Sequence, residues 1–120
     1  MKNENSSGNI TVSPDVIATI VKNAIADIEG VDKIYGDNEI KALGFIKIKN
    51  RNENGNIKVY VKSSKEVDIE IPVVLSYGAN VMTVSKEIQE KAKEAVESVA
   101  GMDVKDIDII VEQISLDEEK

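Results

Sequence analysis

Two segments of this chain place apolar residues at helical spacing, and that pattern limits the possible folds more than any other feature. The first segment follows Ser13-Pro14, where serine is a favoured N-cap and proline suits the first helical turn. The second follows Asn80, another favoured N-cap residue. We expect the helices to end at Gly30 and Gly101, because glycine commonly closes a helix. Their apolar stripes consist of Ile17, Ile20, Val21, Ala24 and Ile28 in the first helix and of Val81, Val84, Ile88, Ala92, Ala95 and Val99 in the second.

Most of the remaining sequence alternates apolar and polar residues, which is typical of strands that bury one face. Asn54-Gly55 favours a hairpin turn between two of these strands. Pro72 lies inside another strand, and we expect an edge or a bulge there, because proline cannot donate to a ladder of hydrogen bonds. The predicted strands span residues 45–49, 57–62, 67–77 and 104–114, with a short strand at best at 10–12 and a short extended piece and a turn within 31–42. The side chains expected to face the core are Ile57, Val59, Val61, Val67, Ile69, Ile71, Val73, Leu75, Ile107, Ile109 and Val111.

Two amphipathic helices and four or five strands must share one core. The simplest arrangement is an α+β two-layer sandwich, with both helices on one face of a mixed, mostly antiparallel sheet. The strand 67–77, the second helix and the strand 104–114 should form a right-handed βαβ unit. We expect Gly78 to adopt a positive φ at the sharp turn from strand to helix.

The composition excludes much catalytic and metal chemistry. The chain has neither cysteine nor histidine, which rules out thiol nucleophiles, thiolate zinc sites and imidazole bases. No motif pairs a nucleophile with a base, so we expect no enzyme, no catalytic residue, no cofactor and no metal centre. The net charge of −7 and the few, dispersed aromatic residues argue against nucleic-acid binding.

Two further candidate sites have simpler explanations. Free amides at Gly78-Ala79-Asn80 could hold an anion, but turn geometry and helix capping already explain these residues. Oxygen ligands for a metal ion would come together only if the strand with Asp106 and Asp108 lay beside the strand with Asp68 and Glu70. We expect these carboxylates to be solvated instead.

Charge is distributed unevenly along the chain. Residues 41–65 contain seven basic residues and one acidic residue, whereas the rest contains eight basic and 21 acidic residues. Strand alternation places lysines at one end of the outer sheet face and carboxylates at the other, with scattered apolar groups. This face is either a solvated sheet with cross-strand ion pairs, which is the commoner situation, or a binding surface. The residues of the candidate binding surface are Phe45, Lys58, Tyr60, Lys62, Asp68, Glu70, Val74 and Ile110.

If the face binds, we expect Tyr60 near its centre, because tyrosine is favoured at protein interfaces. Charges of both signs would let two copies meet in antiparallel fashion, so the partner is a second copy or another protein. Like charges directly opposite one another destabilise a sheet. We therefore expect the strands of Asp68 and Asp106 to be offset in register or separated, with residues 9–12 as the separating strand.

Hydropathy along the chain bears on targeting. The sequence begins without an apolar segment and has no stretch of about 20 apolar residues, so we expect neither a signal peptide nor a membrane span. A cytoplasmic location follows as the expectation. We expect one domain over residues 9–115, a polar tail at 1–8 and a charged tail at 116–120.

Three blocks of sequence resemble the bacterial envelope stress response family, also called the alkaline-shock or general-stress protein family of Gram-positive bacteria. The most specific piece is Tyr77-Gly78-Ala79-Asn80-Val81, at the join between the long strand and the second helix. Residues 32–56, which include most of the lysine-rich stretch, do not match the family. The matching blocks are residues 8–17 with Glu29-Gly30-Val31, residues 67–81, and parts of residues 84–104 with Val111-Glu112.

The resemblance implies a small cytoplasmic protein with no established enzymatic activity and no catalytic residues to carry over. Some members are held at the inner face of the membrane by a small membrane-anchor partner and support cell-envelope homeostasis. Others are linked to control of fatty-acid synthesis through acetyl-CoA carboxylase. The expected function is therefore a non-enzymatic scaffold or adaptor of the envelope stress response. The alternative is a protein regulator of fatty-acid biosynthesis that binds an enzyme.

Overall fold

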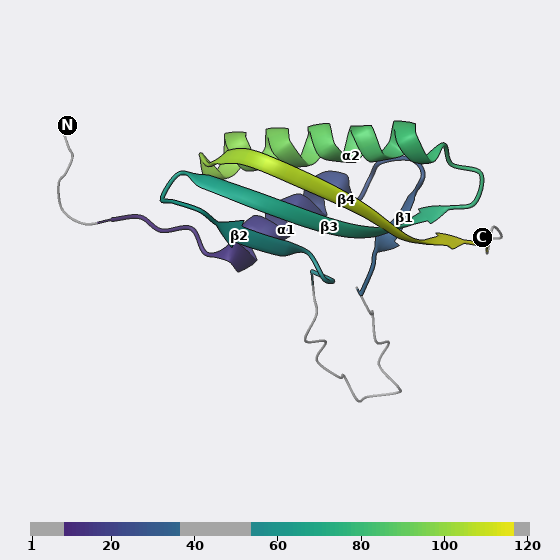
Figure 1. The fold of residues 1–120 in the computed structure, drawn as a ribbon, viewed down its shortest axis with the longest axis horizontal. Coiled ribbons are helices and arrows are strands. Elements are labelled where there is room, and N and C mark those ends of the chain that lie inside the picture. Colours follow the sequence, from purple (N-terminus) through teal and green to yellow (C-terminus); the bar gives the residue numbers. More distant parts are fainter. Residues whose placement is uncertain (1–8, 37–53, 117–120) are drawn as a thin grey trace, which may run out of the picture.

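The computed structural model describes residues 9–36 and 54–116 (Figure 1). The predicted strand 45–49 with Phe45, most of the turn after Gly36, the whole predicted tail 1–8 and residues 117–120 of the other tail lie outside these ranges. Residues 10–12 are not part of a strand. The elements in chain order are α1 (Pro14–Ile25), β1 (Val31–Ile34), β2 (Lys58–Val61), β3 (Glu66–Ser76), α2 (Val81–Ala95), the π-helical turn η1 (Val96–Ala100) and β4 (Asp103–Ser115).

The long strand β3 is the centre of a four-stranded mixed sheet. On one side it pairs with β4 in parallel along its whole length. On the other side it pairs antiparallel with two short strands in turn, first with β2 and then with β1. The predicted α+β class and the parallel pairing of the two strands that flank α2 are therefore confirmed.

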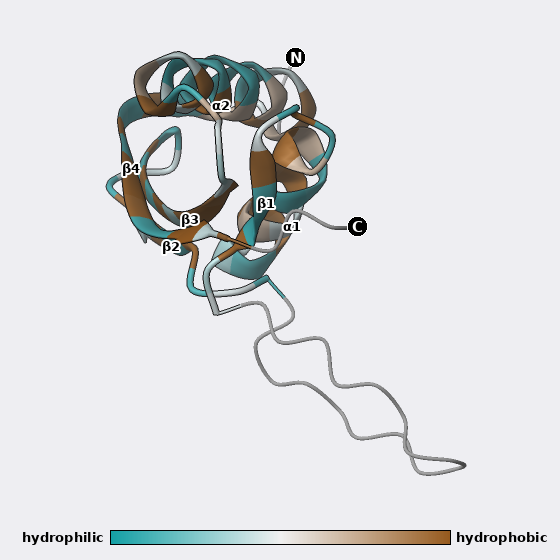
Figure 2. Cartoon of the chain, turned by 90° about the vertical axis from the view of Figure 1, so that its right-hand side faces the viewer, coloured by the Kyte–Doolittle hydropathy of each residue, from teal (hydrophilic) through white to brown (hydrophobic). Residues whose placement is uncertain are grey.

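Both helices pack on the same face of this sheet and close a single core (Figure 2). The inward side chains of β3 form its centre, as alternation predicted, and none is more than 1% exposed. Ile107, Ile109 and Val111 of β4 pack against the core and are half-buried. Val61, also predicted to face inward, is 51% exposed because it ends β2, which among the described residues pairs with a strand only on the β3 side. The buried side chains of β3 are Val67, Ile69, Ile71, Val73 and Leu75.

The start of α1 follows the prediction, but its end does not. The Ser13 hydroxyl accepts a hydrogen bond from the Val16 amide, as an N-cap does. The helix stops at Ile25, so Gly30 is not its C-terminal cap. Gly30 instead has φ +99° in the turn before β1, where an added Cβ would lie 2.8 Å from Val84. The buried residues of the helix are Ile17, Ala18, Val21 and Ile25, whereas the expected Ile20 and Ala24 are half-buried and Ile28 is buried in the turn.

The second helix begins as predicted, with the Asn80 side chain accepting a hydrogen bond from the Thr83 amide. Its last turn is π-helical, and this changes which side chains face inward. Val96 is fully buried, whereas Val99, which regular helical spacing placed in the core, is 69% exposed. Gly101 then ends the helix with φ +72°, as expected.

Pro72 does not lie on an edge strand, as the sequence suggested it might, because β3 is central. It falls between the last residue paired with β2, Glu70, and the first paired with β1, Val73. Its carbonyl accepts a hydrogen bond from the Tyr35 amide at 2.9 Å, so its missing N–H group also belongs to the β1/β2 side. The proline therefore sits at a junction where the ladder changes partner, one residue before the register shift at Val73/Val74 between β3 and β4.

Candidate interaction surface

The outer face of the sheet is the side that neither helix covers, and its side chains form rows across the strands. The candidate residues Tyr60 and Asp68 share one row, and Lys58 and Glu70 share the next. Toward the other end the rows become apolar, with Pro72 beside Ile110. From β2 through β3 to β4 the first two rows are Tyr60–Asp68–Asp106 and Lys58–Glu70–Asp108.

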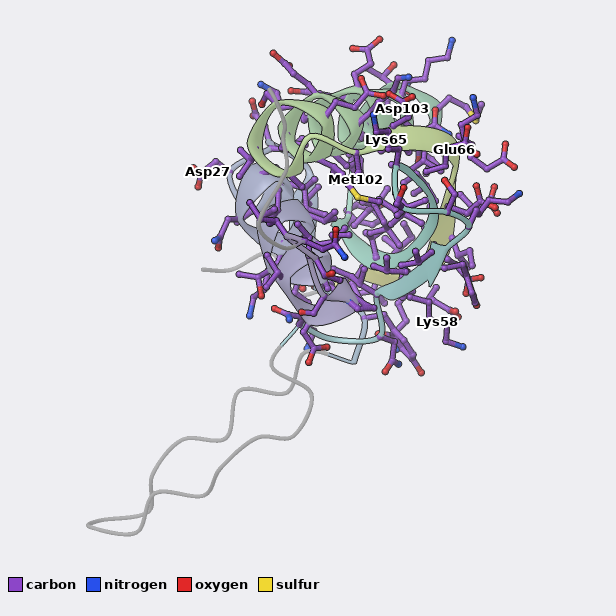
Figure 3. All side chains as sticks on the ribbon, turned by 90° about the vertical axis from the view of Figure 1, so that its left-hand side faces the viewer. Asp27, Lys58, Lys65, Glu66, Met102 and Asp103 are labelled. Carbon is purple, nitrogen blue, oxygen red and sulfur yellow. The ribbon has the colours of Figure 1, made fainter. Side chains whose placement is uncertain are left out.

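Tyr60 and the two lysines of this face are accessible. The Tyr60 side chain is 51% exposed, and Lys58 projects outward beneath the sheet in Figure 3. The Lys62 ammonium lies 3.5 Å from the Asp68 carboxylate across the strand pair. Because both partners touch solvent, this ion pair contributes little stability, on the order of 0–1 kcal/mol. The lysine therefore remains available to an incoming partner.

The apolar candidates behave differently from one another. Ile110 is 37% exposed, as a surface position requires. Val74 is only 2% exposed, so its assignment to an accessible surface was wrong. It lies in the central strand between Lys33 of β1 and Gln113 of β4, and a central-strand residue has neighbours on both sides.

The expected separation of the acidic strands was also wrong. β4 lies directly beside β3, with Asp68 paired to Asp106 and Glu70 paired to Asp108. Residues 9–12 do not intervene. One contact offsets part of the repulsion between Asp68 and Asp106, because the backbone amide of Asp106 donates a hydrogen bond to the Asp68 carboxylate at 3.1 Å. The single-helix crossover through α2 returns the chain beside β3, and that topology outweighs the like charges.

Charge on this face is sorted by strand rather than from end to end, which corrects the sequence-based expectation. Lys58 lies on β2 and Lys62 directly follows that strand, whereas β3 and β4 carry the carboxylates. Lys105 at the start of β4 is the exception, with its ammonium 3.9 Å from the Glu66 carboxylate. Figure 3 shows Glu66 near Lys65 and Asp103, where the Asp103 amide donates to the Lys65 carbonyl.

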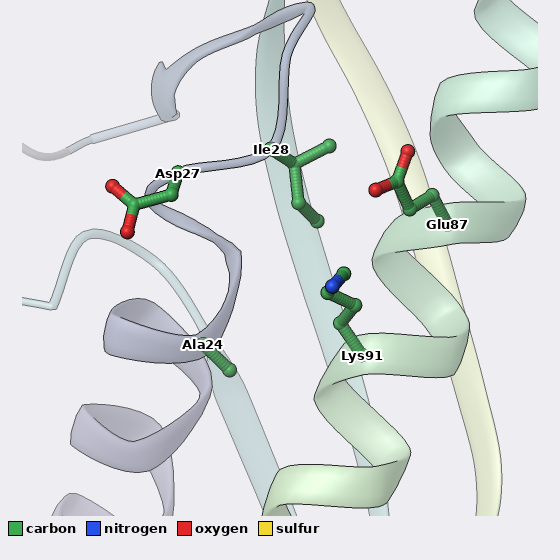
Figure 4. A pocket seen from close by; sticks show the side chains of 5 residues that line it. All are labelled: Ala24, Asp27, Ile28, Glu87 and Lys91. Atoms are coloured by element: carbon green, nitrogen blue, oxygen red, sulfur yellow. The ribbon is translucent and has the colours of Figure 1, made fainter.

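The four carboxylates brought together by β3 and β4 do not form a metal site. Within residues 9–36 and 54–116, no group of three or more acidic side chains is arranged to hold a metal ion. A depression of about 200 Å³ lies between the end of α1 and the flank of α2 (Figure 4). Glu87 and Lys91 project into it beside Ile28, whereas the Asp27 carboxylate points away. It gathers no set of convergent polar groups that would orient a ligand.

One carboxylate that the sequence did not single out has a defined role. The Glu97 side chain accepts a hydrogen bond from the Val104 amide at 3.2 Å and pairs with the Lys93 ammonium at 3.3 Å. The Val104 hydrogen bond, aided by Lys93, lowers the pKa of Glu97 below its usual value. The Val104 hydrogen bond joins η1, the turn that follows α2, to the start of β4, whereas the Lys93 pair lies within the helical segment. The i, i+4 spacing of Lys93 and Glu97 was visible in the sequence, but the contact with Val104 requires the fold.

None of the helices in the described parts of the chain is long and apolar enough to cross a bilayer.

Comparison with known proteins identifies the family. A family model described as "cell envelope-related function", that of the ASP23 proteins, matches residues 2–116. The chain belongs to this family. Membership confirms the resemblance to the alkaline-shock proteins that the sequence blocks indicated.

Two bacterial relatives illustrate the match, and both are uncharacterised. Spy1614 of Streptococcus pyogenes is 33% identical over 117 residues, which cover 97% of this chain and 95% of the relative. YloU of Bacillus subtilis is 31% identical over 108 residues, which cover 89% of this chain and 88% of the relative. No solved structure matches the chain significantly. The comparisons therefore establish the family and its cell-envelope connection, and they add no site residues.

Proposed function

We propose that this protein is a non-enzymatic adaptor or scaffold in cell-envelope homeostasis and that it holds a protein partner on the outer face of its sheet. The observation that carries the proposal is the exposure of Tyr60 among Lys58, Lys62 and Asp68 on a sheet face that neither helix covers. Tyrosine provides a large contact area together with a hydroxyl that can be hydrogen-bonded, which is why it is enriched at interfaces.

The charges around Tyr60 suit a reversible contact. Lys58 on β2 and Lys62 just after it lie within one strand spacing of the carboxylates on β3, so a partner can pair with charges of both signs. Such exposed charges guide association and are screened over about 10 Å at 0.1 M salt. The partner is either a membrane-anchored protein, which would hold this chain at the inner face of the membrane, or a second copy. A cytoplasmic protein recruited in this way needs no membrane span of its own.

The test begins in cells with a photo-crosslinking amino acid at position 60 and, as a control, at the exposed position 90 on α2. We expect a specific adduct from position 60 alone. Mass spectrometry of the adduct then separates the candidates: a membrane protein or a copy of the chain supports the proposal. An enzyme of fatty-acid synthesis would instead support the alternative function as a regulator of that pathway.

Purified protein provides the second arm. Tyr60→Ala and the double variant Lys58→Glu/Lys62→Glu should each lose the captured partner, because both change exposed side chains without disturbing the core. Light scattering reports whether the partner is a second copy. If both variants keep the same mass and the same bound proteins at low salt, the outer face is only a solvated surface and the proposal fails.

A further inference from the structure

The outermost strand of the sheet, β4, has a free edge. It pairs with β3 on one side, and among residues 9–36 and 54–116 no strand pairs with its other side (Figure 1). A free edge presents unpaired backbone N–H and C=O groups, to which another extended chain can bind. The β4 edge is the longest in the described sheet, because β1 and β2 are each four residues long.

The backbone groups that face this edge can be assigned. Hydrogen bonds to Tyr35 and Gly30, the residues that flank β1, show that Pro72 and Ser76 direct their backbone groups away from β4. The odd-numbered residues of β3 therefore bond β4. In a parallel ladder such a residue bonds to the two residues that flank its partner. Ile71, which is paired with Ile109, therefore forms backbone hydrogen bonds with Asp108 and Ile110. The backbone N–H and C=O groups of Ile109 itself point away from β3, to the free edge. By the same alternation, Ile107 and Val111 also face the free edge.

The usable part of the edge is regular and lightly protected. Register shifts lie near Lys105 and Glu112, and between them residues 106–111 pair with residues 68–73 without interruption. Natural edges are usually blocked by proline, inward charges or bulges. Here the run 106–111 contains no proline. The helix α2 runs beside β4 (Figure 1), and its Gln89 amide donates a hydrogen bond to the Ile107 carbonyl at 3.1 Å.

The charges select the kind of strand that would fit. Asp106 and Asp108 are exposed on the outer face, and each stands opposite a carboxylate of β3. On β4 itself, Lys105 precedes Asp106, and its ammonium lies 3.9 Å from the Glu66 carboxylate. Lys58 on β2 and Lys62 just after it lie on the far side of β3 and cannot be cross-strand neighbours of β4. A basic side chain on an added strand would stand directly opposite each of these aspartates and offset the repulsion. On the inner face, the half-buried Ile107, Ile109 and Val111 would favour apolar partners.

We infer that residues 106–111 of β4 bind an extended segment of a partner protein that carries lysine or arginine at alternate positions with apolar residues between them. This inference rests on the proposed adaptor function, because it names what one edge of the adaptor would hold. Pairing β4 with β4 of a second copy fits less well. In an antiparallel pairing of the two strands centred on Ile109, Asp106 would face Glu112 of the other copy, so acidic side chains would again oppose one another.

The probe is a fluorescein-labelled peptide, Lys-Val-Lys-Val-Thr-Val, titrated with the full chain and followed by fluorescence anisotropy. We expect binding that weakens as salt rises, and no binding of the same peptide with glutamate in place of lysine. A peptide with every backbone amide methylated keeps its charge but cannot add to a sheet, and it should not bind. The variant Asp106→Asn/Asp108→Asn should lose roughly fivefold in affinity, as two exposed cross-strand charge pairs would. The matched control Glu29→Gln/Asp32→Asn removes two exposed acidic residues elsewhere and should bind like the wild type.

Amide hydrogen exchange tests the location. Peptide binding should slow exchange at Ile109 and Val111 and leave Ile110 unchanged, since the Ile110 amide already bonds β3. Unchanged exchange at Ile109 and Val111, or equal binding of the methylated or acidic peptide, would overturn the inference. Peptide-blocked dimerisation of the wild type through β4 would assign the edge to a second copy and overturn the proposed occupant. Tyr60→Ala should keep full peptide affinity, so failure here is distinguishable from failure of the proposed function.

Discussion

The two faces of β3 differ sharply in how favourably their side chains interact with their neighbours. On the inner face, five aliphatic side chains are at most 1% exposed and pack against both helices. On the outer face, Asp68 and Glu70 stand beside the carboxylates of Asp106 and Asp108. The same strand therefore carries a nearly ideal core on one side and unfavourable charge pairs on the other.

The difference shows which interaction decides the strand order. Burying one valine, leucine or isoleucine side chain contributes about 1.5–3 kcal/mol. A cross-strand pair of exposed charges changes stability by only about 0.2–1 kcal/mol. Placing β4 beside β3 brings Ile107, Ile109 and Val111 against the core, which outweighs two repulsive pairs. Electrostatic arguments about strand order fail for this reason when the charges face solvent.

The largest expected effect comes from the inner face. Ile71→Ala should reduce the free energy of unfolding by about 2–5 kcal/mol, because the side chain is fully buried and its removal leaves a cavity. Ile110→Ala on the outer face is the control and should cost less than about 1 kcal/mol. Urea titration of both variants measures the contrast. Equal losses would mean that the outer face is as tightly packed as the core.

The sequence predicted the elements well, and the reasons are local. Alternation identified the buried side chains of β3, and capping chemistry located the starts of both helices at Ser13 and Asn80. The errors arose where tertiary structure overrides local pattern. The π-helical turn after α2 exposes Val99, and nothing in the local spacing signals it.

The candidate surface was predictable only in part. Strand parity placed Tyr60 and Lys58 on the exposed outer face, because parity depends on one strand alone. The burial of Val74 and the pairing of Asp68 with Asp106 depend on which strands become neighbours. The free edge of β4 depends on the same information. Strand order is a property of the whole chain, so a local pattern cannot reveal it.

Substitutions at two glycines, Gly30 and Gly78, should cause losses of stability that are smaller than the loss at Ile71. Gly30 and Gly78 have nearly equal positive φ angles, but an added Cβ at Gly30 would lie 2.8 Å from Val84, whereas at Gly78 it would meet nothing within 4 Å. Gly78→Ala should therefore cost about 1–2 kcal/mol from backbone strain alone. Gly30→Ala should cost at least about 1 kcal/mol more, because the Val84 side chain must also move to make room for the new methyl group. Thermal unfolding that ranks the two variants equally would contradict the close approach.

The outer face offers a stabilising change. Asp106→Asn/Asp108→Asn should raise the free energy of unfolding by about 0.5–1 kcal/mol at low salt, since it removes the charge from one member of each repulsive pair. The gain should shrink at high salt, where exposed charges are screened. Glu29→Gln/Asp32→Asn controls for the change in net charge. A destabilised double variant would mean that these aspartates make contacts that outweigh the repulsion.

The smallest effect concerns Glu97, a carboxylate whose hydrogen bond and ion pair are not opposed by a cross-strand carboxylate, unlike those of Asp68. Its pKa is lowered by the Val104 hydrogen bond and by Lys93, so the folded state favours the ionised form. The stabilisation is present above the unfolded-state pKa, near 4.5, and is lost as the pH falls through the lower folded-state pKa. Glu97→Gln can still accept the Val104 hydrogen bond but does not titrate. The loss of stability below pH 4.5 should therefore be shallower in this variant than in the wild type, as chemical denaturation at a series of pH values would show. Identical acid profiles would mean that the junction of α2 and β4 does not depend on the charge of Glu97.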